Sequence, residues 1–222
     1  MTLVFHPRAE PDLESVDAKH LSWKQLVNYS KDEIANLPLG LGVLGDYFEI
    51  ELIKDGKNLW RVSNSVPWLL NLGYRLSGVE LIVEGDAGSH LGAMISGGRV
   101  IVHGDVGSYA GYRARRGEIW ASGTVGRHAG AHMIAGTLIA KAIITGDEET
   151  LGFGARRGSF VFKNWSQDAG SSRSMRRKYR PTWMGLLHQP GSAFAWLDPS
   201  ADWLQCRLPQ ASMHAELICR DV

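Results

Sequence analysis

Short apolar runs rich in β-branched residues alternate with polar residues and glycines over residues 72–162, and this pattern repeats. Leu81–Gly88 aligns with Val100–Gly107 and then with Ile119–Gly126, each shifted by nineteen positions. No unit contains an apolar run with the length and periodicity of a helix. Because self-similarity at a period of roughly 20 residues is typical of solenoids, we expect each unit to form one turn of a coiled strand.

Glycines follow the same period. One series has five members, the last of which comes after an insertion of three residues near Ile143–Thr145: Gly73, Gly92, Gly111, Gly130 and Gly152. A glycine at a recurring corner permits a positive φ or the close approach of a neighbouring turn. We therefore interpret residues 59–163 as a parallel β-helix of the all-β class, in which these glycines have structural roles.

The strand of each unit indicates which side chains face inward. Two positions, two residues apart, are apolar in every unit, and side chains alternate along a strand, so both should point inward. They are Leu81, Val100, Ile119, Leu138 and Phe160, and then Val83, Val102, Ala121, Ala140 and Phe162. On the outer face Glu80, Arg99 and Glu118 alternate in charge, so stacked units would pair them.

The position between the two inward ones should face outward, yet it is apolar in every unit. Its members are Ile82, Ile101, Trp120, Ile139 and Val161. A continuous apolar stripe on an outer face is typical of a surface that another chain, or another part of the same chain, covers. We predict that this stripe belongs to a partner interface.

The flanking segments differ from the repeat. Residues 1–58 predict a helical cap and first strands, with a capping box at Ser30–Glu33. The solenoid is predicted to begin at Trp60–Val62, one period before Val79–Leu81. Residues 164–222 show no period, so we expect an irregular C-terminal tail that packs on the solenoid or on a partner through its aromatic side chains. The tryptophans of this tail that we expect to be covered are Trp183, Trp196 and Trp203.

Composition reduces the number of possible functions. The chain has 24 Lys and Arg against 23 Asp and Glu, a net charge of +1, so no overall field would recruit nucleic acid or an anionic membrane. The two cysteines, Cys206 and Cys219, form no CxxC pair, which excludes an iron–sulfur or cysteine-type zinc site. The first residues do not resemble a signal peptide and no run of 18 apolar residues occurs, so we expect a cytoplasmic protein.

Histidines of successive units suggest an alternative function. His90 and His128 occupy one repeat position with Tyr109 between them, whereas His103 and His132 occupy two others. β-Helical enzymes of the carbonic-anhydrase type build a zinc site from such histidines, although those folds advance in hexapeptides. A stand-alone β-helical zinc enzyme is therefore the alternative to a non-catalytic chain.

Two other motifs have structural interpretations. Gly152–Gly158 imitates a dinucleotide fingerprint, but no helix pattern and no later acidic residue follow it. Asp86 and Asp105 precede repeat glycines, where Asx-type hydrogen bonds within turns are common. No motif pairs a Ser or Cys nucleophile with a His base, so we assign no catalytic residue and no metal ligand.

Arginines gather at nearby positions of neighbouring units. They are Arg113, Arg115, Arg116, Arg156 and Arg157. A solvated cationic face is one interpretation. The other is contact with acidic residues of a partner protein or with a polyglutamate-bearing cofactor, because guanidinium groups bind carboxylates in a bidentate manner. We include these arginines in the predicted partner interface.

Tandem Gly-Asp-x-Gly-x-x-x-Gly units follow Ser30–Pro38 and Leu44–Phe48 in this chain. Over about residues 22–162 they resemble the C subunit of formylmethanofuran dehydrogenase and its counterpart in the bacterial formyltransferase/hydrolase complex. The repeat is also similar to the end of the large subunit of glutamate synthase, so a detached domain of that kind is a further alternative. The chain departs from the family pattern at Arg115–Arg116, at Arg156–Arg157 and at the insertion.

The resemblance implies a right-handed parallel β-helix that is a structural, non-catalytic subunit of a one-carbon complex. Its implied partners are amidohydrolase-like, formyltransferase-like and molybdopterin-domain-like subunits, with no nucleic acid and no membrane. A methanofuran-type cofactor and tetrahydromethanopterin would act elsewhere in the complex, and this chain would bind neither. The resemblance does not distinguish a molybdenum or tungsten dehydrogenase from the hydrolytic complex.

Overall fold

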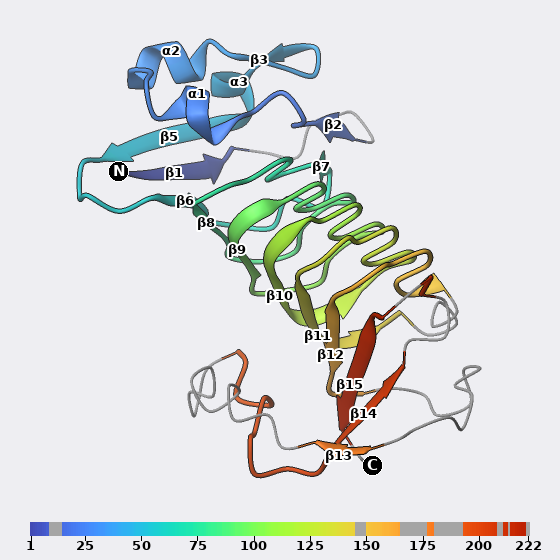
Figure 1. Cartoon of the computed structure of the whole chain (residues 1–222). Helices are drawn as coiled ribbons and strands as arrows, with labels where there is room; N and C mark the ends of the chain where they lie inside the picture. Colours follow the sequence, from blue (N-terminus) through green and yellow to red (C-terminus); the bar gives the residue numbers. More distant parts are fainter. Residues whose placement is uncertain are drawn as a thin grey trace.

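The computed structural model describes residues 1–8, 15–144, 150–164, 177–179, 193–207, 211–212 and 214–220. The described chain is mostly β, with one large mixed sheet, two small sheets and a few short helices (Figure 1). This agrees with the predicted all-β class. No helix among these residues has the length and apolar character needed to cross a lipid bilayer.

The elements follow one another along the chain from cap to tail. In the N-terminal part they are β1 (Thr2–Pro7), β2 (Val16–Asp17), α1 (Trp23–Leu26), α2 (Lys31–Ala35), β3 (Pro38–Leu39), β4 (Gly42–Val43), α3 (Leu44–Tyr47) and β5 (Phe48–Ile53). Then come β6 (Leu59–Val62), β7 (Leu69–Leu70), β8 (Glu80–Val83), β9 (Ser96–Val102), β10 (Arg116–Val125), β11 (Thr137–Ile143), β12 (Ser159–Phe162), β13 (Arg177–Tyr179), β14 (Trp203–Arg207) and β15 (Glu216–Arg220). The large sheet has the order β13-β14-β15-β12-β11-β10-β9-β8-β6-β1-β5.

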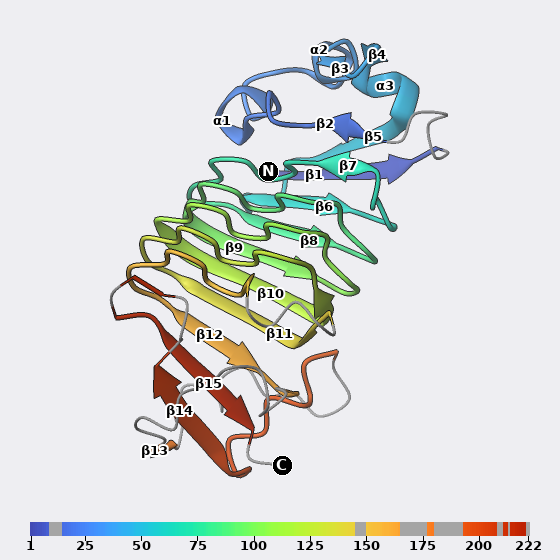
Figure 2. The ribbon, with the colours of Figure 1, turned by 90° about the vertical axis from the view of Figure 1, so that its right-hand side faces the viewer.

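The middle of the large sheet is a stack of parallel strands in the predicted register. Leu81 lies beside Val100, Val100 beside Ile119, and Ile119 beside Leu138. All of these inward side chains are buried. A second series of parallel bridges joins Val66, Ala87 and Val106, which lie outside the strands, and reaches Val125 at the end of β10. Each repeat unit therefore leaves the sheet, makes a second parallel contact and returns one strand farther on (Figure 2).

The first unit departs from the predicted register. Trp60 pairs with Leu81 rather than with Val79, so this unit is longer than the others by two positions. The additional length lies just after Val66, where Trp68 and Leu69 are buried and β7 pairs with β2 of the cap. The prediction that the first unit keeps the common period was wrong because these side chains are needed to join the repeat to its cap.

The inserted residues leave the last unit of the repeat in register. Leu138 lies beside Phe160 and Ala140 beside Phe162, in unbroken parallel pairing of β11 with β12. Part of the insertion, residues 145–149, falls outside the described chain. The length change is therefore absorbed between the strands, and the core files continue across it.

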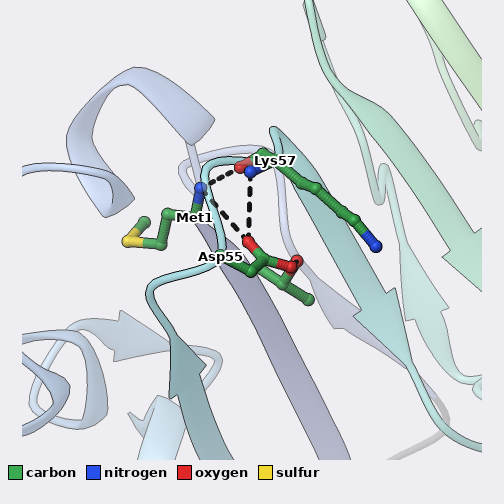
Figure 3. Close-up of polar contacts among 4 residues, drawn as sticks. Met1, Asp55 and Lys57 are labelled. Carbon is green, nitrogen blue, oxygen red and sulfur yellow. Dashed lines mark hydrogen bonds and ion pairs between the residues drawn. The ribbon is translucent and has the colours of Figure 1, made fainter.

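The cap closes the first unit. The capping box is present as predicted: Ser30 Oγ accepts a hydrogen bond from Glu33 N (3.3 Å), and Glu33 Oε2 accepts one from Ser30 N (2.7 Å). The loop between β5 and β6 is tied to β1, since the Asp55 carboxylate accepts hydrogen bonds from Thr2 Oγ1 (2.6 Å) and Lys57 N (3.1 Å) and lies 3.6 Å from the Met1 ammonium. The ammonium also donates to the Lys57 carbonyl (Figure 3). The Thr2 hydroxyl is the main cause of the lowered pKa of Asp55.

The prediction of an irregular tail was wrong for residues 203–207 and 216–220. β15 continues the parallel stack beyond β12, with Leu217 beside Phe160 and Cys219 beside Phe162. β14 then pairs antiparallel with β15, and β13 with β14. A long segment without the repeat pattern separates Phe160 from Leu217 in the sequence, so a search for successive units does not find the last one. Trp183 lies outside the described residues.

Candidate partner-binding surfaces

The outward apolar file of the large sheet is continuous. We call this file the strand face: Ile82, Ile101, Trp120, Ile139 and Val161, which lie side by side on β8 to β12. Its two halves differ in exposure. Ile82 and Ile101 are half-buried, whereas Trp120 is 6% exposed, Ile139 1% and Val161 0%.

The C-terminal half of the strand face is covered by the chain itself. Phe194, Leu197, Trp203 and Ile218 form one buried cluster with it. The Phe194 ring meets Trp120 edge-on at 5.6 Å, and Trp203 Nε1 donates to the Asp198 carbonyl (2.8 Å). The predicted partner contact is therefore corrected to an intramolecular one for Trp120, Ile139 and Val161, the second of the two coverings that the sequence allowed. Ile101 is partly buried against the same cluster, and Ile82 and Ile101 stay predicted partner contacts.

Beside the strand face runs the predicted file of alternating charges. Arg99 Nε lies 2.8 Å from Glu118 Oε2, and Arg99 Nη1 lies 3.8 Å from Glu80 Oε2. The same guanidinium lies over the Trp120 ring at 4.7 Å. The three charged residues line an open groove of about 710 Å³ whose other wall is the glycine corner at Gly78, Gly98, Gly117 and Gly136. Their side chains are about 40% exposed, so each ion pair contributes roughly 0.2–1 kcal/mol.

Opposite the strands, each unit has a segment in which the sign of φ alternates. We call these segments the turn face: residues 71–75, 90–94, 109–113, 128–132 and 150–154. Tyr109, Gly111 and Arg113 have φ of +61°, +67° and +54°, and the two residues between them do not have positive φ. Their N–H groups donate alternately to the next and the previous unit: Tyr109 N to Arg127 O, Gly111 N to Leu91 O, and Arg113 N to Ala131 O. This alternation bonds the turn face from unit to unit without β-strands.

The glycines of the predicted series lie at the centre of the turn face. All five have positive φ, from +59° to +72°. A Cβ on Gly92 would lie 2.8 Å from Ile119 Cδ1, and one on Gly130 would overlap the Phe160 ring. Both conformation and space therefore require glycine here, whereas Tyr109 and the histidines at the outer positive-φ sites point away from the core.

Ring side chains stack along the turn face. His90 and Tyr109 lie parallel at 4.8 Å with an interplanar angle of 4°, and Tyr109 and His128 at 4.8 Å with 19°. Tyr112 stands edge-on to His132, and His132 edge-on to Phe153, at 5.9 and 5.7 Å. The separation matches the spacing of neighbouring strands, so equivalent rings are stacked by the repeat itself.

This arrangement does not bring the histidines together as metal ligands. Tyr109 lies between His90 and His128, and His103 Nδ1 lies 3.3 Å from Glu84 Oε2 on another side of the unit. No group of three His, Cys, Asp or Glu side chains with metal-binding geometry occurs in the described part of the chain. Burial lowers the pKa of His90, while the negative charge of Asp17 opposes this effect.

Four of the predicted arginines follow directly after segments of the turn face. Arg115 and Arg116 come after residues 109–113, and Arg156 and Arg157 come after residues 150–154. We call the corner formed by Arg115, Arg116, Ile134, Arg156 and Arg157 the arginine patch; all five side chains are exposed. Arg113 differs, because its guanidinium lies over the Tyr112 ring at 5.3 Å. Among the described residues, the four arginines of the patch form no ion pair within 4.0 Å.

The two other motifs serve the stacking of units. Asp86 Oδ1 accepts a hydrogen bond from Asp105 N (2.7 Å), and Asp105 Oδ1 accepts from Thr124 N (2.6 Å). These carboxylates therefore bond the next unit rather than their own turn. Gly152 and Gly154 have positive φ in a turn segment that is followed by β12 and not by a helix, so the segment lacks the helix N-terminus of a dinucleotide site.

Comparison with solved structures gives a full-length match. No protein-family model and no curated protein matches the sequence. A chain in the X-ray crystal structure of the formyltransferase/hydrolase complex (FhcABCD) from Methylorubrum extorquens, in complex with methylofuran, is similar with a TM-score of 0.62 and 21% sequence identity. The match covers 99% of this chain and 100% of that chain, so the two share a fold over their whole length.

Proposed function

We propose that this chain is a right-handed parallel β-helix that acts as the C-type, non-catalytic scaffold subunit of a formyl-handling one-carbon complex. The observation that supports this most is the full-length match to a chain of FhcABCD, with 99% and 100% of the two chains covered. A shared domain alone would match only in part. Here the match spans 99% of this chain, and the family resemblance of the sequence includes the formyltransferase/hydrolase complex among its members.

The use of the polar side chains supports a scaffold role. Asp86 and Asp105 bond backbone N–H groups of the next unit, Arg99 bridges two glutamates, and His90 stacks on Tyr109. These groups, which could otherwise supply acid–base chemistry, are thus used to hold one unit on another. A rod of this kind presents fixed surfaces to other subunits, while a methanofuran-type cofactor and tetrahydromethanopterin would be bound by those subunits.

The proposal is tested by isolating the tagged chain from its native host at its natural expression level. We expect amidohydrolase-like, formyltransferase-like and molybdopterin-domain-like subunits to co-elute in fixed ratio. Deleting the chain should abolish formyl transfer between tetrahydromethanopterin and the furan cofactor, whereas the chain alone should show no turnover. The proposal fails if the chain is isolated without such subunits, or if the pure chain carries one zinc and hydrates carbon dioxide until His90 and His128 are replaced by alanine.

A further inference from the structure

The arginine patch is built by the stacking of three units. Arg115, Ile134 and Arg156 occupy equivalent positions in successive units, since Ile134 N donates to Ala114 O (2.7 Å) and Arg156 N to Met133 O (2.8 Å). Neighbouring units are about 4.8 Å apart, so the backbone sites of the two arginines lie roughly 10 Å from each other with isoleucine between them. Arg116 and Arg157 flank Ala135 in the same way. Four arginine side chains therefore extend from one small area of the surface.

The charge of this area is not compensated within the described chain. The nearest acidic side chain in the sequence, Glu118, is held by Arg99 at 2.8 Å. The whole chain has a net charge of only +1, so the patch is a local concentration of charge and not a sample of a basic protein. Such a cluster raises the local concentration of carboxylates and can bind them through pairs of hydrogen bonds.

The same area contains apolar anchors. Ile134 is 41% exposed and Phe153, one unit along, is 50% exposed with its ring held edge-on by His132. Exposed aromatic and aliphatic side chains among arginines have the composition of the centre of a protein–protein interface. Covering exposed apolar side chains of this size with a partner contributes favourably to the free energy of binding.

Resting on the scaffold role proposed above, we propose that the arginine patch, together with Phe153, binds an acidic segment of a partner polypeptide. The carboxylates of that segment meet the four guanidinium groups, and its apolar residues cover Ile134 and Phe153. Single-stranded nucleic acid fits less well, because it stacks successive bases on several open aromatic faces, and Phe153 is the one ring that the proposed site contributes. Here the ring faces of His90, Tyr109 and His128 are stacked on one another.

A binding experiment with the full chain tests the surface directly. The probe is a fluorescein-labelled peptide of twelve residues in which glutamates alternate with leucines. We expect binding that weakens with added salt and that falls by about tenfold or more in the double variant R115E/R156E. The matched control K31E/K54E makes the same change of net charge on exposed lysines of the cap and should keep the affinity within about twofold. Phe153→Ser should weaken binding without changing its salt dependence.

Three results would overturn the inference. One is unchanged binding by R115E/R156E with an intact circular dichroism spectrum. Another is an equal loss in the control variant, which would mean that only net charge matters. The third is an occupant of another kind, shown either by tighter binding of a twelve-nucleotide RNA or by a dimer of the chain that R115E/R156E dissociates.

Purification of the complex from the native host distinguishes this inference from the scaffold role. If R115E/R156E still co-purifies with every formyl-handling subunit in the wild-type ratio, the acidic-segment inference is wrong and the scaffold role stands. If the wild-type chain recovers no such subunit but binds the peptide through the patch, the scaffold role is wrong and the surface stands.

Discussion

The strand face and the turn face belong to the same repeat units but are built differently. On the strand face, β-branched and aromatic residues in extended conformation pair in register, and the outward file is apolar. On the turn face, φ alternates in sign, and only glycine fits at the central site. The strand face is apolar and is covered in part by a C-terminal segment, whereas most outer sites of the turn face hold polar rings and arginines. The comparison indicates that a repeat can conceal one surface and present another.

The largest effect should come from the covered part of the strand face. Trp120→Ala should lower the free energy of unfolding by about 3–5 kcal/mol, because it leaves a cavity beneath Phe194. Ile82→Ala, on the half-buried part, should cost only about 1 kcal/mol. Trp120→Phe should be close to neutral, since Trp120 Nε1 has no hydrogen-bond partner in the described structure. Urea unfolding of the three variants measures this, and equal losses for Trp120→Ala and Ile82→Ala would contradict the covering.

The next effect distinguishes two costs of replacing a glycine: the cost of a positive φ and the cost of steric overlap with a neighbouring side chain. Gly130 and Gly78 have nearly the same φ, +67° and +68°, but a Cβ at Gly130 overlaps Phe160 and one at Gly78 meets no atom within 4 Å. Gly78→Ala should therefore cost about 1 kcal/mol for the backbone alone. Gly130→Ala should cost a further 1–3 kcal/mol, roughly, for overpacking. Equal changes in the urea midpoint would show that Phe160 shifts and makes room for the added methyl group.

A smaller effect tests the outer sites of the turn face. Both Tyr109→Ala and Tyr109→Gly remove the ring between His90 and His128, a loss of about 1 kcal/mol. Because Tyr109 has a φ of +61°, glycine should be more stable there than alanine by about 1 kcal/mol. At the neighbouring buried Ala110, which does not have positive φ, glycine should instead destabilise. Thermal unfolding of the three variants checks the order, and a Tyr109→Ala variant more stable than Tyr109→Gly would exclude it.

The smallest effect is a dependence of stability on pH at the ring stack. The pKa of His90 in the fold is below its ordinary value of 6.5, so the unfolded chain binds the proton more readily. Stability should be constant well above pH 6.5, decrease as the pH falls through this value, and level off below the lowered pKa. His90→Asn should remove this contribution. A urea midpoint whose pH profile is the same in both proteins would show that His90 titrates alike in the folded and unfolded states.

The sequence predicted the regular part of the fold well. Leu81, Val100 and Ile119 are neighbours in register as their spacing required, and the capping box at Ser30 formed as written. The prediction failed where the repeat is interrupted. Trp68 and Leu69 lengthen the first unit, and β15 returns to the stack after a long segment without the repeat pattern. The positive φ of Tyr109 was also missed, because a ring in that conformation is unfavourable locally and is imposed by hydrogen bonds to both neighbouring units.

The candidate surfaces divide in the same way. The outward positions of Trp120 and Ile139 and the closeness of Arg115 to Arg156 follow from spacing alone, since equivalent residues of a repeat must lie in line. Spacing does not predict that Phe194 covers Trp120, or that Ile134 is exposed beside the arginines. By itself, then, the sequence determined the period, the inward files and the order of side chains on each face. Only the tertiary structure decided which face is covered, because that choice depends on contacts between the repeat and non-periodic segments far away in the chain.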